Sequence, residues 1–438
     1  MSQYTALTAR AAGDLDPTFG DKNGKKVLAF PNTKSTTGRC IVEGPDGKIY
    51  VGGGVDAQGI DAIQKLGVAR LHKDGSSDDD FGIKDESGKG GFVIVTFGPM
   101  QDTQLLQILF LTVGGEPRIL LSGIDTIKGE AVLARLHLDG RVDERFGVKG
   151  LLTVKLPENL SKVLGLEPPF VTTTGIDASG PCTVADGKIY VVTKIYMPIW
   201  VATVAVLIRL NSDGSFDTSF NKTGYVAVTN QALVNSTLSD VLVLNGKIIV
   251  CGKLNGNAMV ACLNDDGTFN TDFDEMGFKL FPESELTFEK LSPYGKTGVL
   301  VAGWGPNPRH GVLACLTEKG ELEPTFNDAK VLFQSFGEGS IVLFFGVGLA
   351  DGKIIVSGRL LGNGKKPAFV VARFLLDGTL DHDFGHGKGW SSTEFANNYT
   401  VAHAMALQED GKVLVAGDWG FLSPAALIAC FLNPAASR

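Results

Sequence analysis

The chain has 438 residues and a formal net charge of −8, and without a basic cluster it lacks the electrostatic footprint of nucleic-acid binding. Apolar residues make up 44% of it, which excludes an intrinsically disordered chain, because such chains cannot bury enough apolar surface to fold. Its 56 glycines are roughly twice the usual share, but they do not recur at every third position, which excludes a collagen-like chain.

A tight turn followed by a strand recurs along the chain. The turn is Asp-Gly-Lys or Asn-Gly-Lys, and Asp-Gly and Asn-Gly are favoured in two-residue hairpin turns, which need positive φ. The residues that follow are β-branched or otherwise apolar, as in a buried strand. Five clear copies begin at Asp46, Asp186, Asn245, Asp351 and Asp410, and two weaker ones begin at Glu116 and Lys296.

A second pattern runs from a strand through a turn to a phenylalanine. Six whole copies of this pattern end at Phe81, Phe146, Phe220, Phe273, Phe326 and Phe384. A seventh copy is split: its front half is Ala429-Cys-Phe-Leu-Asn, near the C-terminal end, and its back half is Leu15-Asp-Pro-Thr-Phe19-Gly, near the start.

These repeats predict an all-β fold, a seven-bladed β-propeller of four-stranded antiparallel blades. Each period holds about four strand-like runs, which is the content of a propeller blade. An open stack of repeats has capped ends and would not begin in the middle of a motif. A closed ring can, because its two ends meet and complete the motif. We therefore expect one propeller over residues 14–433, with tails at 1–13 and 434–438. An N-terminal strand near residues 25–30 completes the last blade.

The alternating motifs resemble the bacterial delta-60 repeat family. The resemblance rests on Ala-Arg-Leu-x-x-Asp-Gly and Leu-Asp-x-x-Phe-Gly alternating with Asp-Gly-Lys-Ile-x-Val-x-Gly, and it is clearest at residues 69–82, 134–147 and 372–385. The copy at 314–327 departs from it, with Lys319 and Glu323 in place of the usual Asp residues. The resemblance implies a β-propeller and no shared catalytic residue, so it leaves the function open.

Arginine and aspartate recur together, eight residues apart. Where Cys262 or Cys315 replaces the arginine, the later position is no longer aspartate, although Cys430 is an exception because its partner position is Asp16. We expect structural ion pairs with charge-assisted hydrogen bonds, and buried cysteines in place of the missing arginines. The expected pairs are Arg70 with Asp78, Arg135 with Asp143, Arg209 with Asp217, and Arg373 with Asp381.

Acidic loops such as Asn264–Asp272 suggest calcium, which prefers clustered carboxylates. The acids are not spaced at alternate residues as in a helix-loop-helix calcium site, and aspartate also stabilises turns by accepting backbone hydrogen bonds. His382 and His386 have a metal-ligand spacing, but they lie in a loop. We expect no cofactor and no metal site, with calcium as the less favoured alternative.

Residues that differ between repeats are the candidates for ligand binding. The two kinds of regular turn lie on one face of a propeller, and the irregular loops lie on the other face around the channel mouth. Aromatic side chains beside polar groups there could stack on sugars or anchor a protein partner, or they could simply pack their own loops onto the blades. The candidate ligand-binding residues are Tyr196, Trp200, Trp304, Arg309, His310, Asp418, Trp419 and Phe421.

The sequence contains no nucleophile elbow, phosphate-binding loop or zinc-protease motif. It therefore favours a non-catalytic binding scaffold for a protein or carbohydrate ligand. The alternative is a hydrolase or lyase that acts on a sugar or lactone through acids at the channel mouth. A third possibility is an assembly component that pairs through its outer strands. The acids considered for the enzyme are Asp102, Asp125, Glu283, Glu285, Glu338 and Asp418.

The expected location is the cytoplasm. The N-terminal residues hold no signal-peptide core, the longest apolar stretch (197–208) is too short to cross a bilayer, and the six cysteines form no paired motif. Free buried thiols suit a reducing compartment, while secretion without a signal peptide is left open. We further expect a monomer that does not insert into membranes.

Overall fold

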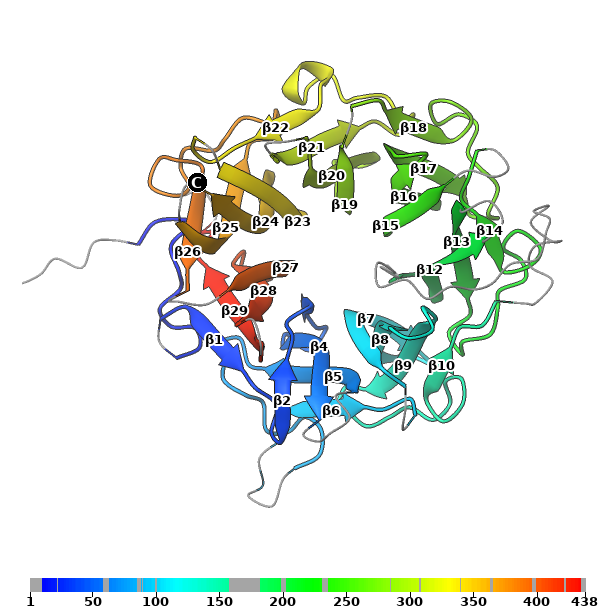
Figure 1. Cartoon of the computed structure of the whole chain (residues 1–438), viewed down its shortest axis with the longest axis vertical. Helices are drawn as coiled ribbons and strands as arrows, with labels where there is room; N and C mark the ends of the chain where they lie inside the picture. The colour runs from blue at the N-terminus through cyan, green and yellow to red at the C-terminus, as the bar shows by residue number, and fades with distance from the viewer. Residues whose placement is uncertain are drawn as a thin grey trace, which may run out of the picture.

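The computed structural model describes residues 10–21, 23–57, 63–84, 88, 90–98, 101–156, 182–197, 202–230, 235–283, 285–306, 309–338, 340–362, 365–395, 399–420 and 423–434. Their strands form seven antiparallel sheets, which are arranged as blades around a central axis (Figure 1). A single turn of 3₁₀ helix, η1 (Asn327–Ala329), is the only helical element within these ranges. None of the described residues forms a helix that could cross a membrane.

The first three blades follow one another in chain order, each with its innermost strand first. In blade 1 the inner strand is interrupted and consists of two short pieces, β2 and β3. The strands are β2 (Thr33–Thr36), β3 (Cys40–Glu43), β4 (Ile49–Ala57), β5 (Gln64–Leu71) and β6 (Phe92–Val95) in blade 1; β7 (Thr103–Val113), β8 (Glu116–Asp125), β9 (Ala131–His137) and β10 (Leu151–Thr153) in blade 2; and β11 (Cys182–Ala185), β12 (Lys188–Met197), β13 (Ala202–Leu210) and β14 (Tyr225–Ala227) in blade 3.

Blades 4 to 6 repeat this plan, and blade 7 takes its outer strand from the N-terminal part of the chain. The strands are β15 (Ser236–Leu244), β16 (Lys247–Leu254), β17 (Asn257–Asn264) and β18 (Phe278–Phe281) in blade 4; β19 (Thr287–Tyr294), β20 (Gly298–Trp304), β21 (Gly311–Leu316) and β22 (Leu332–Gln334) in blade 5; β23 (Ser340–Ala350), β24 (Lys353–Gly362), β25 (Lys365–Phe374) and β26 (Trp390–Glu394) in blade 6; and β27 (Thr400–Leu407), β28 (Val413–Trp419), β29 (Ala425–Phe431) and β1 (Lys25–Leu28) in blade 7.

Strand β1 closes the ring, as the split repeat predicts. It pairs antiparallel with β29, with Lys25 opposite Ala429 and Leu28 opposite Ala426. In Figure 1 these two strands lie side by side, β1 in blue and β29 in red. The two halves of the split motif also rejoin, because the Asp16 amide donates to the Cys430 carbonyl at 2.8 Å. The predicted seven-bladed propeller closed by an N-terminal strand is thus confirmed.

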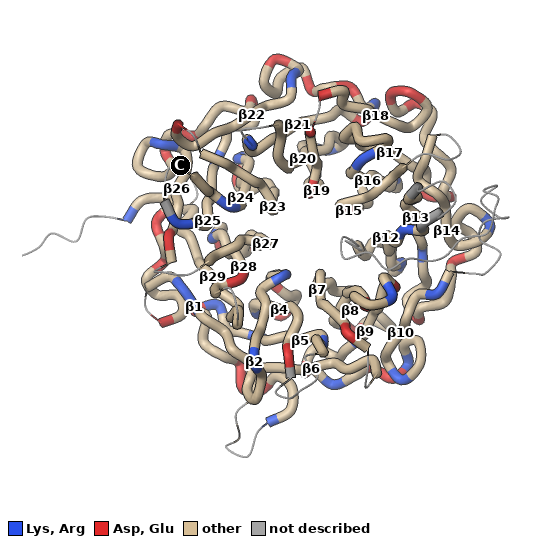
Figure 2. Tube along the Cα trace, in the orientation of Figure 1, with Lys and Arg blue, Asp and Glu red and all other residues tan. Residues whose placement is uncertain are grey.

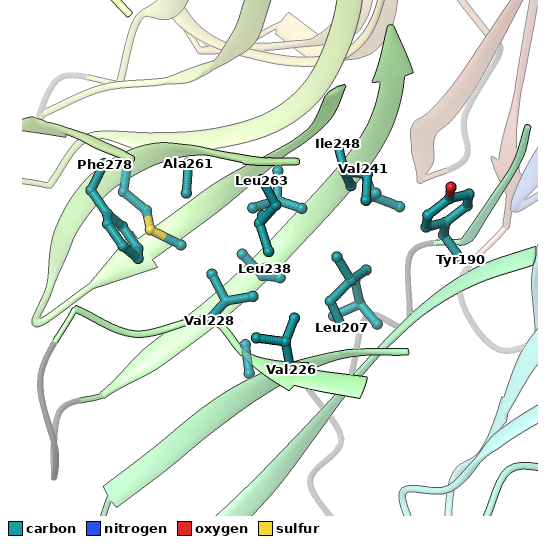
Figure 3. Close-up of a cluster of buried hydrophobic side chains, with 14 of the residues drawn as sticks. Tyr190, Leu207, Val226, Val228, Leu238, Val241, Ile248, Ala261, Leu263 and Phe278 are labelled. Carbon is teal, nitrogen blue, oxygen red and sulfur yellow. The ribbon is translucent and has the colours of Figure 1, made fainter. Parts of the chain in front are cut away.

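The hydrophobic core lies between neighbouring blades rather than at one centre. Figure 3 shows one such cluster, in which Tyr190 and Leu207 of blade 3 face Val241 and Ile248 of blade 4. All four side chains are at most 5% exposed. Because each blade is apolar on both faces, it can bury them only against two neighbours, which favours a closed ring.

The repeated Phe and Asp-Gly residues form the junctions between blades. A Cβ atom on Gly140 of blade 2 would lie 3.1 Å from the Phe81 ring of blade 1, and Gly140 has a φ of +90°, so glycine is needed there. At each junction, a backbone amide just after the Phe donates a hydrogen bond to a backbone carbonyl of the next blade. The donor and acceptor residues are Gly20 and Asp74, Gly82 and Asp139, Gly147 and Asp213, Asn221 and Asp266, Asp274 and Lys319, Asn327 and Asp377, and Gly385 and Ala12.

The structure brings each expected arginine and aspartate together. The distance from Nε to Oδ2 is 2.9 Å for Arg70–Asp78 and Arg135–Asp143, and 2.8 Å for Arg209–Asp217 and Arg373–Asp381. Each guanidinium also lies over the phenylalanine of its own blade, at 4.8 to 5.1 Å from the ring centroid. In blade 1, Arg70 Nη1 additionally donates to the Leu138 carbonyl of blade 2 at 2.6 Å. The pair therefore joins two blades as well as stabilising one.

A second cation at this position escaped the sequence analysis. The lysine of the Asp-Gly-Lys turn reaches the same carboxylate, as Lys188 Nζ does to Asp217 at 2.9 Å. In blade 7, where Cys430 replaces the arginine, Lys412 Nζ still lies 3.1 Å from Asp16. Lys412 therefore gives Asp16 a cationic partner in place of the arginine. All six cysteines are free and buried, and burial raises the pKa of the Cys182 and Cys430 thiols to about 12.

Candidate functional site

A β-bulge interrupts the inner strand at the same place on five blades. The bulges lie between Leu105 and Gln107, Leu238 and Asp240, Phe288 and Lys290, Phe344 and Gly346, and Ala402 and Ala404. In blade 1 the gap between β2 and β3 occupies the equivalent place. Opposite the bulge stands a glycine: a Cβ on Gly358 would lie 1.9 Å from the Leu343 carbonyl oxygen, and one on Gly417 would lie 2.0 Å from that of Val401. Glycine therefore permits the close approach that the bulge requires.

Each bulge adds one extra residue to the inner strand, and four of these residues, Arg39, Leu106, Phe345 and His403, line a central cavity. The residue that follows the opposing glycine is the second variable position of each blade. We call these the bulge position and the post-glycine position, and together they define the channel mouth. The bulge positions are Arg39, Leu106, Ser239, Glu289, Phe345 and His403, and that of blade 3 lies outside the described residues. The post-glycine positions are Gly54, Ile124, Lys194, Lys253, Trp304, Arg359 and Asp418, where blade 3 has Thr193 in place of the glycine.

A cavity of about 240 Å³ lies at the centre of the ring. Its walls come from the inner strands of blades 1, 2, 4, 5, 6 and 7, and they include Arg39, Lys290, Phe345 and His403. Figure 1 shows these inner strands, such as β7, β15 and β27, closest to the axis. The cavity thus collects side chains from blades that are far apart in the sequence.

Asp418 organises a polar cluster between blades 7 and 1. Its Oδ2 lies 2.9 Å from His403 Nε2 and 3.5 Å from Arg39 Nη2, and its Oδ1 accepts the Gly38 amide at 2.9 Å. Burial opposes ionisation of Asp418, but the hydrogen bond with His403, the charge of Arg39 and the Gly38 amide outweigh it and lower its pKa. Asp418 is therefore an anion at neutral pH.

His403 stays neutral in this cluster. Burial lowers its pKa, Asp418 opposes that effect, and the positive charges of Arg39 and Arg359 add to the lowering. The contact with Asp418 places the ring proton on Nε2, because a carboxylate oxygen can only accept. Arg39 and Arg359 therefore act on the same imidazole from blade 1 and blade 6.

A second cluster surrounds Trp304 of blade 5. The Trp304 Nε1–H donates to Glu289 Oε1 at 3.3 Å, so the bulge and post-glycine positions of this blade are hydrogen-bonded, as they are in blade 7. Arg309 lies 4.4 Å and Lys253 of blade 4 lies 5.8 Å from a Trp304 ring centroid. Burial raises the pKa of Glu289, although Lys290, Trp304 and Lys253 oppose the shift.

Asp240 links blades 4 and 5 below this cluster. Its Oδ2 accepts the Leu291 amide at 2.9 Å, and its Oδ1 lies 3.7 Å from Lys290 Nζ. Asp240 is therefore engaged by the neighbouring blade and stabilises the ring.

The structure brings some of the predicted ligand residues together and leaves others apart. Trp304 and Arg309 are in contact, and Asp418 meets His403 and Arg39. His310 is half-buried, with its carbonyl accepting the Gly305 amide at 2.9 Å. Trp419 is half-buried and packs against the core cluster between blades 6 and 7. The side chain of Tyr196 and the whole of Trp200 and Phe421 lie outside the described residues.

The acids considered for an enzyme do not gather in one place. Asp102 accepts the Thr126 hydroxyl at 2.6 Å, and Asp125 accepts the amides of Ile127 and Lys128 at 3.0 Å, so both stabilise loops of blade 2. Three further acids are exposed. They are Glu283, Glu285 and Glu338. Asp418 belongs to the cluster described above.

The acidic loops use their carboxylates in turns. Asp266 Oδ1 accepts both the amide and the hydroxyl of Thr268, at 2.9 and 2.6 Å. His386 Nε2 lies 2.7 Å from Asp14, whereas His382 Nδ1 lies 2.7 Å from the Gly387 carbonyl, so the two histidines have different partners. Over the described ranges, no three His, Cys, Asp or Glu side chains gather as a metal site would require. The expectation of no cofactor stays a prediction.

Apart from Arg309 and Asp418, the charged residues of the channel mouth were missed by sequence reasoning, although a signal was present. The Asp-Gly-Lys repeats are nearly constant up to the glycine, and the next residue then varies, with only Lys194 and Lys253 sharing a residue type. Aligning the repeats at this glycine would have singled out Lys253 and Arg359 beside Trp304 and Asp418. The bulge positions carry no such signal, because a bulge is a property of strand pairing.

Comparisons with known proteins agree with the fold. Residues 44–81, 185–220 and 349–384 match a family model described as "Domain of unknown function (DUF5122) beta-propeller". These segments hold the Asp-Gly-Lys strands and Phe motifs of blades 1, 3 and 6. No curated protein matches the sequence.

Two solved structures are among those that match the chain. The β-propeller domain of the Trilobed protease from Pyrococcus furiosus is 8% identical, over 92% of this chain and 94% of that one, with a TM-score of 0.44. The intramolecular trans-sialidase from Ruminococcus gnavus is 10% identical, over 95% of this chain and 99% of that one, with a TM-score of 0.42. The repeats, the blades and the matched segments together identify the chain as a β-propeller repeat protein.

Proposed function

We propose that this protein is a non-catalytic binding scaffold that holds a protein or carbohydrate ligand at the channel mouth. One observation carries the proposal. Residues that build the ring, such as the junction Phe and Asp-Gly, repeat from blade to blade. The six described bulge positions, in contrast, all carry different residues, and the post-glycine positions share a residue type only at Lys194 and Lys253. A ring that only had to fold would not need such different residues at equivalent positions of its blades.

The chemistry of the channel mouth suits a binding site. It combines a half-buried tryptophan, a polar cluster at Asp418 and a cavity walled by six inner strands. Ligand sites usually pair apolar walls with a few fixed polar groups, and here Phe345 and His403 provide one of each. Trp304 is held by Glu289 and stacked with Arg309, so it is pre-positioned for contact.

One observation favours the enzyme alternative, a hydrolase or lyase acting on a sugar or lactone. Burial raises the pKa of Glu289, as is typical of a general acid. A second, available carboxylate is also needed for such chemistry, and the neighbouring Asp240 is occupied by the Leu291 amide and Lys290. The binding scaffold is therefore the better-supported function.

A double variant, Trp304→Ala with Trp419→Ala, tests the scaffold. Fluorescently labelled protein is applied to a glycan array and to a peptide array, and the double variant should lose the signals of the unaltered protein because the aromatic contacts are gone. Phe333→Ala removes a similarly sized, 39% exposed ring from an outer strand and should change nothing. Near-ultraviolet circular dichroism checks the fold. Undiminished binding by the double variant would show that the ligand lies elsewhere.

Glu289→Gln separates the scaffold from the enzyme. We expect no release of nitrophenol from a panel of nitrophenyl glycosides by either the unaltered protein or this variant. Turnover by the unaltered protein that Glu289→Gln abolishes would establish the hydrolase instead.

A further inference from the structure

The channel mouth is basic although the whole chain is acidic. The chain carries a net charge of −8. At the bulge and post-glycine positions and directly beside them, the cations outnumber the carboxylates. Figure 2 shows Lys and Arg on strands around the centre of the ring, including β16 and β24. The cations are Arg39, Lys194, Lys253, Lys290, Arg309 and Arg359, and the carboxylates are Asp125, Asp240, Glu289 and Asp418.

The carboxylates do not neutralise this group. Asp240 is engaged by Lys290 and the Leu291 amide, and Asp418 is shared by His403, Arg39 and the Gly38 amide. Glu289 is hydrogen-bonded to Trp304 and is partly shielded from solvent. Positive charge therefore exceeds negative charge around the channel mouth, where Arg39 and Lys290 line the cavity and a low-dielectric wall strengthens their field.

Three other cations lie against rings instead of carboxylates. In the described part of the chain, Lys253 and Arg309 lie over Trp304, and Arg359 lies 4.7 Å from the Tyr399 ring centroid. None of these three forms an ion pair with a described residue. Stacking occupies the face of a guanidinium and leaves its N–H edge available for a planar acid.

Two arginines are also incompletely bonded near the same histidine. Arg39 Nη1 is 3.5 Å from His403 Nδ1, and Arg359 stacks on Tyr399, which directly precedes the His403 strand β27. The Nε atoms of both arginines are buried and have no hydrogen-bond partner. Both side chains are nevertheless partly exposed, 32% in the case of Arg39, so other guanidinium nitrogens can reach a ligand.

We propose that the channel mouth binds its ligand through a carboxylate group, which Arg39 and Arg359 hold beside His403. This inference rests on the proposed binding function and specifies the chemistry of the ligand. A carboxylate is planar and accepts two parallel hydrogen bonds from one guanidinium, which matches the arginine edges. Phe345 in the cavity wall offers an apolar face to the rest of the molecule. The carboxylate can belong to an acidic sugar or to a simple organic acid.

Isothermal titration calorimetry of the full chain with five probes tests the proposal. The probes are trigalacturonate, D-glucuronate, succinate, inorganic phosphate and neutral maltotriose. We expect a carboxylate probe to bind, maltotriose not to bind, and affinity to fall as salt screens the arginines. Trigalacturonate or D-glucuronate binding without succinate identifies an acidic sugar, while comparable succinate binding identifies the carboxylate alone. If inorganic phosphate binds as tightly as the carboxylate probes, the assignment of a planar acid is wrong.

Charge-removing variants locate the site. Arg359→Gln should weaken carboxylate binding by about ten-fold or more, because a charge-assisted hydrogen bond is lost. Arg39→Gln provides a second variant, and thermal unfolding shows that each remains folded. Arg145→Gln removes the same charge from an exposed turn on the opposite face and should leave affinity unchanged.

Calorimetry with the carboxylate probes tests the carboxylate site, and array binding by the double variant tests the scaffold function. No binding of any carboxylate probe, or equal affinity in Arg359→Gln and the unaltered protein, would overturn the carboxylate site. If array binding is at the same time lost in the Trp304→Ala, Trp419→Ala double variant, the scaffold function survives with a different ligand chemistry. Array binding that the double variant keeps would remove the proposed function itself.

Discussion

The Arg135 side chain shows what a single residue contributes to the ring. It is 2% exposed, pairs with Asp143, lies over Phe146 and also donates from Nη1 to the Ser212 carbonyl of the next blade. Arg141, in the same blade, pairs with Asp139 at 2.7 Å, but its side chain is 77% exposed. The same two residue types therefore form a buried structural pair and a surface pair within one motif.

Arg135→Ala should destabilise the protein by about 3 kcal/mol, because the buried Asp143 keeps only Arg118 at 3.1 Å and the contacts with Phe146 and Ser212 are lost as well. Arg141→Ala is the matched control and should cost less than about 1 kcal/mol, because surface pairs are screened by water. Urea unfolding measures both. Similar losses in the two variants would contradict the structural role of the buried pair.

Acid should weaken the protein through these aspartates. Burial opposes the ionisation of Asp143, but the Arg145 amide and the charge and hydrogen bond of Arg135 outweigh it and lower its pKa below the ordinary 3.8. Because the folded pKa lies below the unfolded one, the stabilisation is complete above about pH 5 and is lost as the pH falls through the folded pKa. Asp143→Asn should therefore flatten the fall of stability between about pH 5 and pH 2.

The pH series needs a control at an exposed acid. Asp272→Asn alters an exposed aspartate in an equivalent loop of blade 4 and should leave the acid profile unchanged. Thermal unfolding at a series of pH values gives the comparison. An acid profile that Asp143→Asn leaves unchanged would show that this carboxylate contributes nothing to acid sensitivity.

Among the elements, the bulged inner strand positions the site. A Cβ on Gly53 would lie 2.0 Å from the Thr37 carbonyl oxygen, which is backbone and cannot move away easily. A Cβ on the next residue, Gly54, would meet the flexible end of Gln64 at 2.6 Å. Two adjacent glycines therefore have different constraints, and only the first is required by the bulge.

Gly53→Ala should destabilise the protein by about 1–3 kcal/mol, because the new methyl group forces the inner strand of blade 1 to shift. Gly54→Ala should cost less, because the Gln64 side chain can rotate away. Denaturant unfolding of the two variants gives the comparison. A larger loss in Gly54→Ala would contradict the assigned role of the bulge.

The strands could be predicted from the sequence, but their pairing register could not. Asp-Gly-Lys turns and β-branched runs mark the strands locally, so the blades followed from the sequence. A bulge changes which residues face each other across two strands, and no local pattern encodes that change. Glu289 and His403 were missed for this reason, since the bulge alone brings them beside Trp304 and Asp418. The lysine of the turn was missed because its partner lies on a distant loop.

At the scale of the whole molecule, the split repeat is the main link between sequence and shape. Leu15, Asp16 and Phe19 replace the part of the motif that blade 7 lacks, and β1 supplies its outer strand. The architecture was predictable because a missing half-motif at one end matched an extra half-motif at the other. The ligand was not, because binding depends on side chains that the repeats leave free to vary.

A chain that begins at Thr33 should lose cooperative unfolding and melt at a lower temperature. It lacks β1 and the Phe19 ring, so blade 7 exposes an unpaired strand edge and the junction with blade 1 is lost. A chain that begins at Arg10 keeps these contacts and should melt like the full chain. Differential scanning calorimetry compares the three, and equal melting of the chain from Thr33 would contradict closure by β1.

The most direct test of the account is a crystal structure of the full chain soaked with D-glucuronate or trigalacturonate. The account predicts density at the channel mouth, with a carboxylate within hydrogen-bonding distance of Arg39 or Arg359 and close to His403. Density on the opposite face, or a channel mouth that stays empty while the probe binds in solution, would contradict it.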